Sequence, residues 1–325
     1  MAVLFHQNMR RFGGAAPVRN AHYNAAFGQI LAALGAAAPV AVAGFTEVCN
    51  NGAAATAFGP AGVGGGLCAA LGVNHIGNIA CGQTALAGGP EYIAIGVNVA
   101  YPVVSVGRIF LNSSGCSISL IHDISPAIPL TAVWCNQVPS GATPDYRGLV
   151  YVVIAIAGVN VAVGFLHNLY TLEAQRILVM GQLPHMMNMM GNAIPGIAAK
   201  YIGGDFNVQA PPPPYRRGTA RIGYIYLYSN GLAGAPLTLA GVPGLAVPPP
   251  APPPPPPFTA LGTTWAGNLY DYWFSTIDPA PVAPAPPVPL ILPAPGLHGI
   301  TLDTAAGAGA ANQMSDHCAI ILQIT

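Results

Sequence analysis

Charged residues are scarce in this sequence. Lys and Arg together number 10 and Asp and Glu together number 10, so 6% of the 325 residues are charged, against about 25% in ordinary soluble domains. The balance of the two signs excludes a globally basic nucleic-acid binder and an acidic, solvating chain, while a local patch of a few arginines stays open. Two explanations of the scarcity also stay open: partners cover the surface in a homo-oligomer or larger assembly, or the residue identities understate the charge of the natural surface.

Long uninterrupted apolar runs are missing, although 53% of the residues are hydrophobic. No stretch of about 18 or more apolar residues is free of polar and turn residues, so we expect no transmembrane segment. The first eight residues lack a basic segment followed by an apolar one. We therefore expect no signal peptide, and a mature secreted chain stays open.

Closely spaced metal-binding cysteines are absent as well. The six cysteines, at positions 49, 68, 81, 116, 135 and 318, form no CxxC pair and no Cys/His cluster with zinc spacing, so we expect no zinc site. Their even number allows disulfides, but free thiols buried in apolar strands, such as Cys318, are at least as well supported. The redox compartment stays open.

Proline is abundant and unevenly distributed. The 34 prolines concentrate in Pro211–Pro214, Pro248–Pro257 and Pro279–Pro295. Because proline has no backbone N–H to donate, these segments are expected to be exposed, polyproline-like loops rather than central strands. They would act as stiff surface connections, with docking to an aromatic groove as the alternative. We therefore predict a single domain over residues 1–325 with three Pro-rich insertions.

Hydrophobic periodicity predicts many strands and few helices. The apolar run Val3–Phe5, the helical spacing of apolar residues in Phe27–Leu34 and the apolar run Val40–Phe45 predict a β-α-β start. The pattern is typical of an α/β sandwich, with two packed sheets and helices on the outside. Further strands are expected at Tyr92–Val99, Arg108–Leu111, Ser117–Ile121, Leu149–Ile156, Val159–Leu166, Tyr201–Ile202, Arg221–Tyr228, Leu269–Phe274, His298–Leu302 and Cys318–Ile324, and a helix at about Leu169–Met190.

Four short segments place chemically active side chains where predicted strands end, which is where functional sites are often built. One is Gly203-Gly204-Asp205-Phe206-Asn207. Its glycines are expected to let the backbone turn sharply, and Asp205 and Asn207, two residues apart, can project to the same side. The others are Thr46-Glu47-Val48, Tyr270-Asp271-Tyr272 and Ser315-Asp316-His317.

Together these segments resemble the endonuclease/exonuclease/phosphatase superfamily, whose fold is deoxyribonuclease I-like. The successive landmarks are Asn8 at the end of the first strand, Glu47, the strand end at Phe165–Asn168, GDFN at 204–207, YD at 270–271 and SDH at 315–317. The resemblance spans the whole chain. It implies a four-layer sandwich, two packed mixed β-sheets flanked by helices, with a metal-dependent phosphoesterase site at one end of the sheets.

A divalent metal ion is the cofactor that the resemblance implies. Four of the ten acidic residues lie on the landmarks, which chance placement explains poorly. Mg²⁺ or Mn²⁺ takes oxygen ligands and keeps several waters, so few protein ligands are needed. Asn8 and Glu47 are the expected ligands, and Asp316 would help to hold a second metal position or a water.

The catalytic roles follow the same resemblance. Hydrolysis of a phosphodiester needs a base for the attacking water and stabilisation of the leaving oxygen. His317 is the expected base, with Asp271 fixing its tautomer. His167 would face the phosphate from the other side, by a hydrogen bond to a non-bridging oxygen or by helping the leaving group. Asp205 and Asn207 would position the water and the phosphate.

Two arginines are expected to contact the phosphate, Arg147 and Arg108. Arg147 lies twenty residues before His167. Related nucleases pair the equivalent of His167 with a Glu near a phosphate-contacting Arg, and the nearest counterpart here, Ser105–Arg108, contains no carboxylate. His167 is therefore expected to be less basic or differently oriented.

DNA is the expected substrate, cleaved without sequence specificity. Arginine pairs at Arg10-Arg11 and Arg216-Arg217 could flank the site and meet a polyanion. The alternative is a phosphodiesterase or phosphatase acting on lipid head groups or small phosphoesters. An abasic-site endonuclease fits less well, because Cys49 stands where that branch has a Lys. A second alternative is a non-catalytic structural or assembly-forming protein on the same fold, which the full set of landmarks argues against.

Overall fold

The computed structural model describes most of the chain up to residue 208 and shorter pieces beyond it. The described ranges are 2–12, 39–49, 56–59, 66–82, 90–114, 117–143, 146–170, 173–208, 238–240, 270–275, 291–292, 317 and 319–324, with scattered positions between 23 and 36. The Pro-rich segments, apart from residues 291–292, lie outside this part, as do the predicted strands Arg221–Tyr228 and His298–Leu302.

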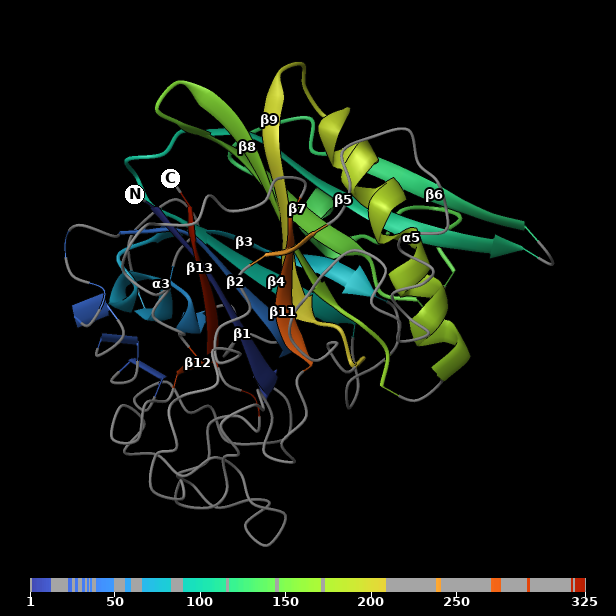
Figure 1. Cartoon of the computed structure of the whole chain (residues 1–325), viewed down its shortest axis with the longest axis horizontal. Helices are drawn as coiled ribbons and strands as arrows, with labels where there is room; N and C mark the ends of the chain where they lie inside the picture. Colours follow the sequence, from blue (N-terminus) through green and yellow to red (C-terminus); the bar gives the residue numbers. More distant parts are fainter. Residues whose placement is uncertain are drawn as a thin grey trace, which may run out of the picture.

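Two mixed β-sheets form the centre of the molecule (Figure 1). The six-stranded sheet has the order β12-β13-β1-β2-β4-β3, and the seven-stranded sheet has the order β10-β11-β9-β8-β7-β5-β6. Within each sheet one pair is parallel, β1 with β2 and β8 with β9, and the other described pairs are antiparallel. The strands are β1 Ala2–Phe12, β2 Val40–Cys49, β3 Asn74–Gly82, β4 Glu91–Val97, β5 Val103–Ser114, β6 Ser117–Ile124, β7 Leu149–Ile156, β8 Val159–His167, β9 Ile197–Asp205, β10 Thr238–Ala240, β11 Asp271–Ser275, β12 Ile291–Leu292 and β13 Ala319–Ile324.

Helices cover the outer faces of both sheets. Helix α5, Glu173–Gly191, packs Met180 and Met186 against Tyr151 of the seven-stranded sheet. Helix α3, Gly66–Ala70, and the helical position Phe27 pack on the six-stranded sheet. A third short helix, α4 at Ala132–Asn136, contributes Trp134 and Cys135 to the core between the sheets. The predicted four-layer α/β sandwich is therefore confirmed.

The core between the two sheets comes from one face of each. Val42 and Ile95 from the six-stranded sheet meet Phe165 and Trp273 from the other. Phe165 packs over Gly44 so closely that a Cβ at Gly44 would come within 2.2 Å of the ring. Large aromatic side chains fill cores efficiently, and the glycine opposite provides the room that this ring needs.

Most predicted elements agree with the structure. Strand β7 has the predicted bounds, and the β-α-β start is confirmed because the described residues around Phe27 are helical and β1 pairs in parallel with β2. Strand β3, with the sequence NHIGNIACG, was not predicted, because its Asn and Gly residues disfavour strands on propensity. Strand β12 lies inside a Pro-rich segment that was expected to be only loop, and it pairs at the sheet edge, where proline is tolerated.

The topology brings several of the landmarks to one end of the sandwich, although Asn8 lies within β1 and not at its end, which corrects the expectation from the sequence. Asn8 of β1 lies opposite Thr46 of β2, while Asp205 of β9 lies between His167 of β8 and Asp271 of β11. The first and last strands also pair, so the two termini lie close together in Figure 1. Strand pairing therefore brings the landmarks of each sheet together, and the packing of the two sheets brings the two groups near one another.

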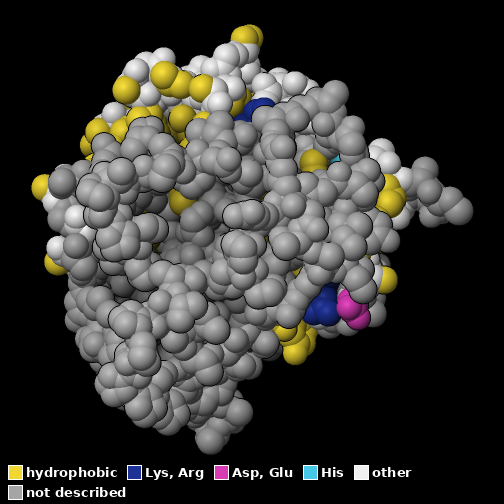
Figure 2. Space-filling model, in the orientation of Figure 1, with side chains coloured by type: hydrophobic (Ala, Val, Ile, Leu, Met, Phe, Trp, Pro, Cys, Tyr) yellow, Lys and Arg dark blue, Asp and Glu magenta, His cyan; other side chains and the backbone are white. Residues whose placement is uncertain are grey.

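The described surface is poor in charge. Figure 2 shows a few Lys or Arg and Asp or Glu side chains on one face, with hydrophobic side chains gathered along its upper left edge. Val99, in the turn that follows β4, is 83% exposed. Among the described residues, no helix has both the length and the apolar character that crossing a membrane requires. Cys68, Cys81 and Cys135 are buried free thiols, and Cys49 is buried as well.

Candidate active site

Strands β1 and β2 supply the first two side chains of the site. The Asn8 amide donates hydrogen bonds from Nδ2 to Glu47 Oε1 at 3.0 Å and to Asp205 Oδ2 at 2.9 Å. Glu47 lies at a register shift of β2 and has a φ of 55°. A β-bulge redirects a side chain, and a non-glycine residue in the left-handed region is uncommon and concentrated at functional sites. The backbone irregularity therefore turns the Glu47 carboxylate toward Asn8.

Strand β9 brings Asp205 to the centre of the group. Gly203 and Gly204 lie within β9 rather than in a turn, which corrects the expectation from the sequence. These positions need glycine because neighbouring atoms approach closely. A Cβ at Gly204 would lie 1.8 Å from the Leu166 carbonyl oxygen. The turn comes at Asn207, with a φ of 51°, whose backbone N–H donates to Asp205 Oδ1 at 2.9 Å. This bond fixes the orientation of the Asp205 carboxylate.

His317 and Asp271 are hydrogen-bonded to each other. His317 Nδ1 lies 2.8 Å from Asp271 Oδ2, and His317 Nε2 lies 3.6 Å from Asp205 Oδ2. The Asp271 side chain is buried and the His317 side chain is 11% exposed. The predicted pairing of these two residues is confirmed, and the other ring nitrogen faces the centre of the site.

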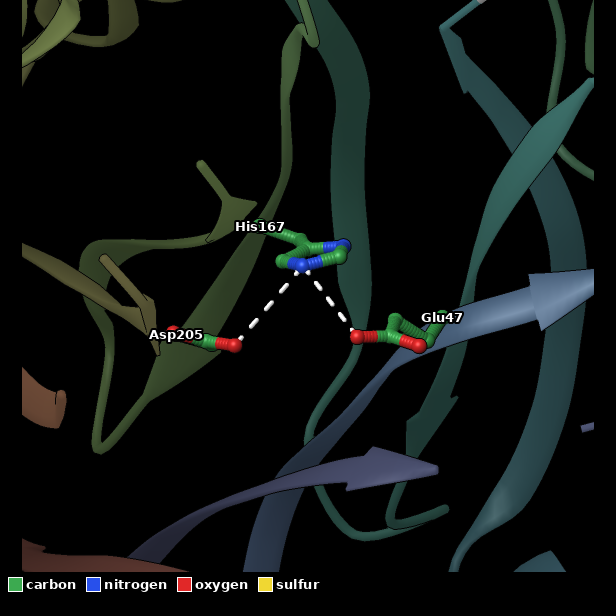
Figure 3. A group of neighbouring side chains, drawn as sticks. All are labelled: Glu47, His167 and Asp205. Atoms are coloured by element: carbon green, nitrogen blue, oxygen red, sulfur yellow. Dashed lines mark ion pairs between the residues drawn. The ribbon is translucent and has the colours of Figure 1, made fainter. Parts of the chain in front are cut away.

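His167 lies between two carboxylates (Figure 3). Its Nε2 is 3.3 Å from Glu47 Oε1 and 3.7 Å from Asp205 Oδ2. The Glu47, Asp205 and His167 side chains come from three strands, β2, β9 and β8. Asp205 thus links His167 on one side of the site with His317 on the other.

Glu91 is the site residue that the sequence reasoning missed. It is the first residue of β4 and is fully buried, and its Oε1 lies 2.5 Å from His167 Nδ1. Arg147 Nε lies 2.6 Å from the other oxygen, Oε2. The expectation that no carboxylate pairs with His167 is therefore wrong. A Glu at the start of an apolar strand, in a chain with ten acidic residues, was the available signal.

The buried charges change one another's pKa values. Burial raises the pKa of Glu91, but His167 and Arg147 outweigh it, so the pKa lies below its usual value. Burial lowers the pKa of His167, but the carboxylates of Glu91 and Glu47 raise it above its usual value. The two carboxylates thus favour the protonated form of His167, which corrects the expectation that it is less basic.

The two arginines expected at the phosphate have different surroundings. Arg147 belongs to the site, because it pairs with Glu91 and donates from Nη1 to the Asn168 carbonyl oxygen at 3.1 Å. Arg108 is 2% exposed, and its Nε and Nη2 lie 2.8 Å from Asp123 Oδ2. Its guanidinium also lies 4.3 Å from the centre of the Trp134 ring. These contacts assign Arg108 to packing under α4 rather than to phosphate binding.

Some predicted features lie outside the described part of the chain. Asp316 and the pair Arg216-Arg217 are not described, and neither are the side chains of Arg10 and Arg11. The structure thus brings together eight of the ten predicted site residues: Asn8, Glu47, Arg147, His167, Asp205, Asn207, Asp271 and His317.

The arrangement fits a divalent cation. The ligand atoms of Glu47, His167 and Asp205 lie within 4.8 Å of one another, and so do those of Asp205, Asp271 and His317. Carboxylate oxygens with an amide nearby form a hard donor set, which suits Mg²⁺ or Mn²⁺ better than a soft metal. A divalent cation beside the buried Asp205 and the partly buried Glu47 would lower the repulsion between the two carboxylates.

Comparisons with known proteins identify the fold. No protein-family model matches the sequence, and no curated protein matches it. A mannosyl-6-phosphatase from Bacteroides thetaiotaomicron is similar in structure, with a TM-score of 0.54 and 14% identity over 100% of both chains. An endonuclease/exonuclease/phosphatase family protein from Leptotrichia buccalis gives 0.52 and 13%, again over 100% of both chains. Another such protein, from Bacteroides thetaiotaomicron, gives 0.50 and 15% over 98% of this chain and 96% of that one. The chain therefore has the deoxyribonuclease I-like fold of the endonuclease/exonuclease/phosphatase proteins.

Proposed function

We propose that this protein is a divalent-metal-dependent phosphodiester hydrolase that cleaves DNA without sequence specificity. The observation that carries the proposal is the position of Asp205, whose Oδ2 lies within 4 Å of Asn8, His167 and His317 side-chain nitrogens. A single carboxylate that joins an amide, a cation and a candidate base supports chemistry at one shared point. Ordinary structural ion pairs do not need such an arrangement.

His317 is proposed as the general base. Asp271 accepts a hydrogen bond from Nδ1 of His317, which leaves Nε2 to take a proton from the attacking water. Nε2 points toward Asp205, which would hold that water in place and stabilise the imidazolium once it forms. Asn207 and Asp205 would position the water and the phosphate.

His167 is proposed to act on the opposite side of the phosphate. Held as a cation by Glu91, it can donate a hydrogen bond to a non-bridging oxygen or to the leaving oxygen. A bound Mg²⁺ or Mn²⁺ would neutralise charge on the phosphate and the leaving oxygen. Asn8 and Glu47 would hold it, and Asp316 is proposed for a second metal position or a water.

The choice of DNA rests on the basic residues of the chain. Its nine Arg and one Lys include the pairs at 10–11 and 216–217, which follow two of the landmarks in sequence. Arginine binds phosphate bidentately, so a polyanion is favoured. The alternative, a phosphatase or phosphodiesterase on lipid head groups or small phosphoesters, is supported by the similarity to a mannosyl-6-phosphatase.

The test compares three substrate classes in parallel: plasmid DNA, sphingomyelin and a sugar monophosphate. Each is incubated with Mg²⁺, with Mn²⁺ and with EDTA. His317→Ala and Asp205→Ala are expected to lower the rate by several orders of magnitude. His185→Ala is the matched control, because His185 lies on α5 in the outer layer.

The outcomes separate the alternatives. Nicking that persists in EDTA, or in both site variants, contradicts the proposed mechanism. Turnover of only the lipid or the sugar phosphate supports the alternative substrate class. Failure to turn over any of the three substrates favours the non-catalytic, structural or assembly-forming alternative.

A further inference from the structure

An exposed tyrosine stands beside the proposed catalytic site and has no role in the mechanism above. Tyr170 follows β8 by three residues and is 70% exposed. It is the only aromatic residue among the strongly exposed large hydrophobic residues of the described chain. A single exposed ring is ordinary on a protein surface, so its position relative to the site decides whether it can contact a substrate.

The loop that carries Tyr170 is anchored to the site. The Asn168 carbonyl oxygen accepts hydrogen bonds from Arg147 Nη1 at 3.1 Å and from Asn207 Nδ2 at 2.9 Å. The backbone N–H of Asn168 donates to the Asp205 carbonyl oxygen at 2.8 Å. Asn168 Nδ2 reaches the Arg176 carbonyl oxygen at 3.2 Å. Tyr170 thus projects from a rim whose position is fixed by the residues proposed to bind the phosphate.

Two further side chains lie on the same rim. Arg176, in the first turn of α5, donates from Nη1 to the Asn207 carbonyl oxygen at 3.1 Å. The Tyr270 carbonyl oxygen accepts from the Phe206 N–H at 2.8 Å, directly before the catalytic Asp271. The pKa of Tyr270 lies above its usual value because of burial, with Tyr170 and Asp205 raising it further and Arg176 opposing the rise. The two hydrogen bonds attach Arg176 and Tyr270 to Asn207 and Phe206, the two residues that follow Asp205.

We propose that Tyr170, Tyr270 and Arg176 form a nucleobase subsite next to the scissile phosphate. The face of Tyr170 would stack on the base of the adjoining nucleotide, Tyr270 would line the inner side, and Arg176 would contact the neighbouring phosphate. Stacking on an aromatic side chain is tolerant of sequence, because every base has a π-face. The inference rests on the proposed function, and it names the substrate class as a phosphodiester that carries a base.

A nucleobase fits this rim better than a lipid or a sugar. A lipid-binding surface needs a contiguous apolar patch, and the described rim offers one exposed ring beside a cation. A planar base next to a phosphate matches a ring next to a guanidinium in both shape and charge.

The test uses two diesters with the same leaving group. Thymidine 5′-(p-nitrophenyl) phosphate carries a base and methyl p-nitrophenyl phosphate does not, so the ratio of their kcat/KM values reports the subsite alone. Tyr170→Ala is expected to lower this ratio about tenfold, equivalent to about 1.4 kcal/mol, and Tyr170→Trp is expected to retain it. Val99→Ala is the control, because Val99 is exposed in the turn that follows β4, whereas Glu91 begins that strand.

An unchanged ratio in Tyr170→Ala overturns the subsite while leaving the hydrolase intact. If the wild-type protein hydrolyses neither diester, the proposed function fails, and binding then decides the subsite. In calorimetry with Mg²⁺, thymidine 5′-monophosphate is expected to bind more tightly than ribose 5-phosphate, and Tyr170→Ala is expected to remove the difference. Tighter binding of phosphocholine than of thymidine monophosphate overturns the proposal in favour of a head-group site.

Discussion

Replacing Glu91 by Gln tests whether the buried carboxylate orients His167. Glu91 is fully buried, lies 2.5 Å from His167 Nδ1 and 2.6 Å from Arg147 Nε, and is the first residue of its strand. The substitution keeps the size of the side chain but removes its charge. Arg147, itself 8% exposed, then loses its buried counter-ion.

The size of the effect follows from that burial. Breaking a buried ion pair by removing one partner costs about 3–5 kcal/mol of unfolding free energy. Because Gln retains one hydrogen-bond acceptor, the expected loss is at the lower end, about 3 kcal/mol. Activity is expected to fall about 10- to 100-fold, as it does when partners of active-site histidines are removed.

The pH dependence supplies a second readout. The pKa of Glu91 is lower in the folded protein than its usual 4.5. Its contribution to stability is therefore present above about pH 4.5 and is lost as the pH falls through the lower, folded pKa. Glu91→Gln is expected to lack this acid-side loss.

The assays are urea denaturation between pH 3 and 7 and the rate of phosphodiester hydrolysis. Glu173→Gln is the matched control, because Glu173 is exposed in the first turn of α5. Full activity and unchanged stability in Glu91→Gln refute the assignment of Glu91 as the residue that positions His167.

Packing, titration and metal binding each allow a further test. Gly204→Ala is expected to lower the free energy of unfolding by at least about 1–3 kcal/mol, the usual cost of overpacking, because the new Cβ would meet the Leu166 carbonyl oxygen. Gly28→Ala is the control, because the space around Gly28 is open, and thermal unfolding of the two variants would show the difference. Burial lowers the pKa of His75, so the unfolded chain binds more protons and stability should fall as the pH drops below about 6.5. His75→Gln should flatten that slope in denaturation curves, and an unchanged slope would contradict the assignment. Mg²⁺ at about 100 times its Kd is expected to stabilise the protein by about 2.7 kcal/mol, which raises the melting temperature. Asp205→Asn should abolish this rise in melting temperature, and an equal rise in both proteins would place the metal elsewhere.

The sequence was informative about the fold where patterns are local. Strand β7 shows its full length as a continuous apolar run, whereas the apolar run Val3–Phe5 marks only the first part of β1, which continues to Phe12. Strand β3 shows no such run, and its pairing with β4 overrides the low strand propensity of its Asn and Gly residues. The four-layer sandwich was implied by the family that the landmarks resemble, since the order of the segments alone does not specify it.

Most residues of the site could be predicted from the sequence, but fewer of the hydrogen bonds and ion pairs between them. The hydrogen bond between His317 and Asp271 follows from a chemical requirement, and the structure contains it. The partner of His167 could not be found by proximity in sequence, because Glu91 lies 76 residues away in the other sheet and only the packing of the two sheets brings it near. Arg108 shows the converse error, since its buried contacts with Asp123 and Trp134 depend on β6 and α4.

The glycines of the GDFN segment illustrate a third limit. A glycine in sequence indicates either a special backbone angle or a close approach, and sequence alone does not distinguish them. In the structure Gly204 is required by contact with Leu166, whereas the left-handed angle belongs to Asn207.

The most direct test of the central claim is plasmid nicking by the wild-type protein and by Asp205→Asn, measured with Mg²⁺ and after chelation with EDTA. Asp205 touches both histidines and Asn8, so a single change should disable the site. The expected result is metal-dependent nicking by the wild type and a loss of several orders of magnitude in the variant. Nicking by Asp205→Asn at the wild-type rate, or nicking that survives EDTA, would contradict a metal-dependent phosphodiesterase centred on Asp205.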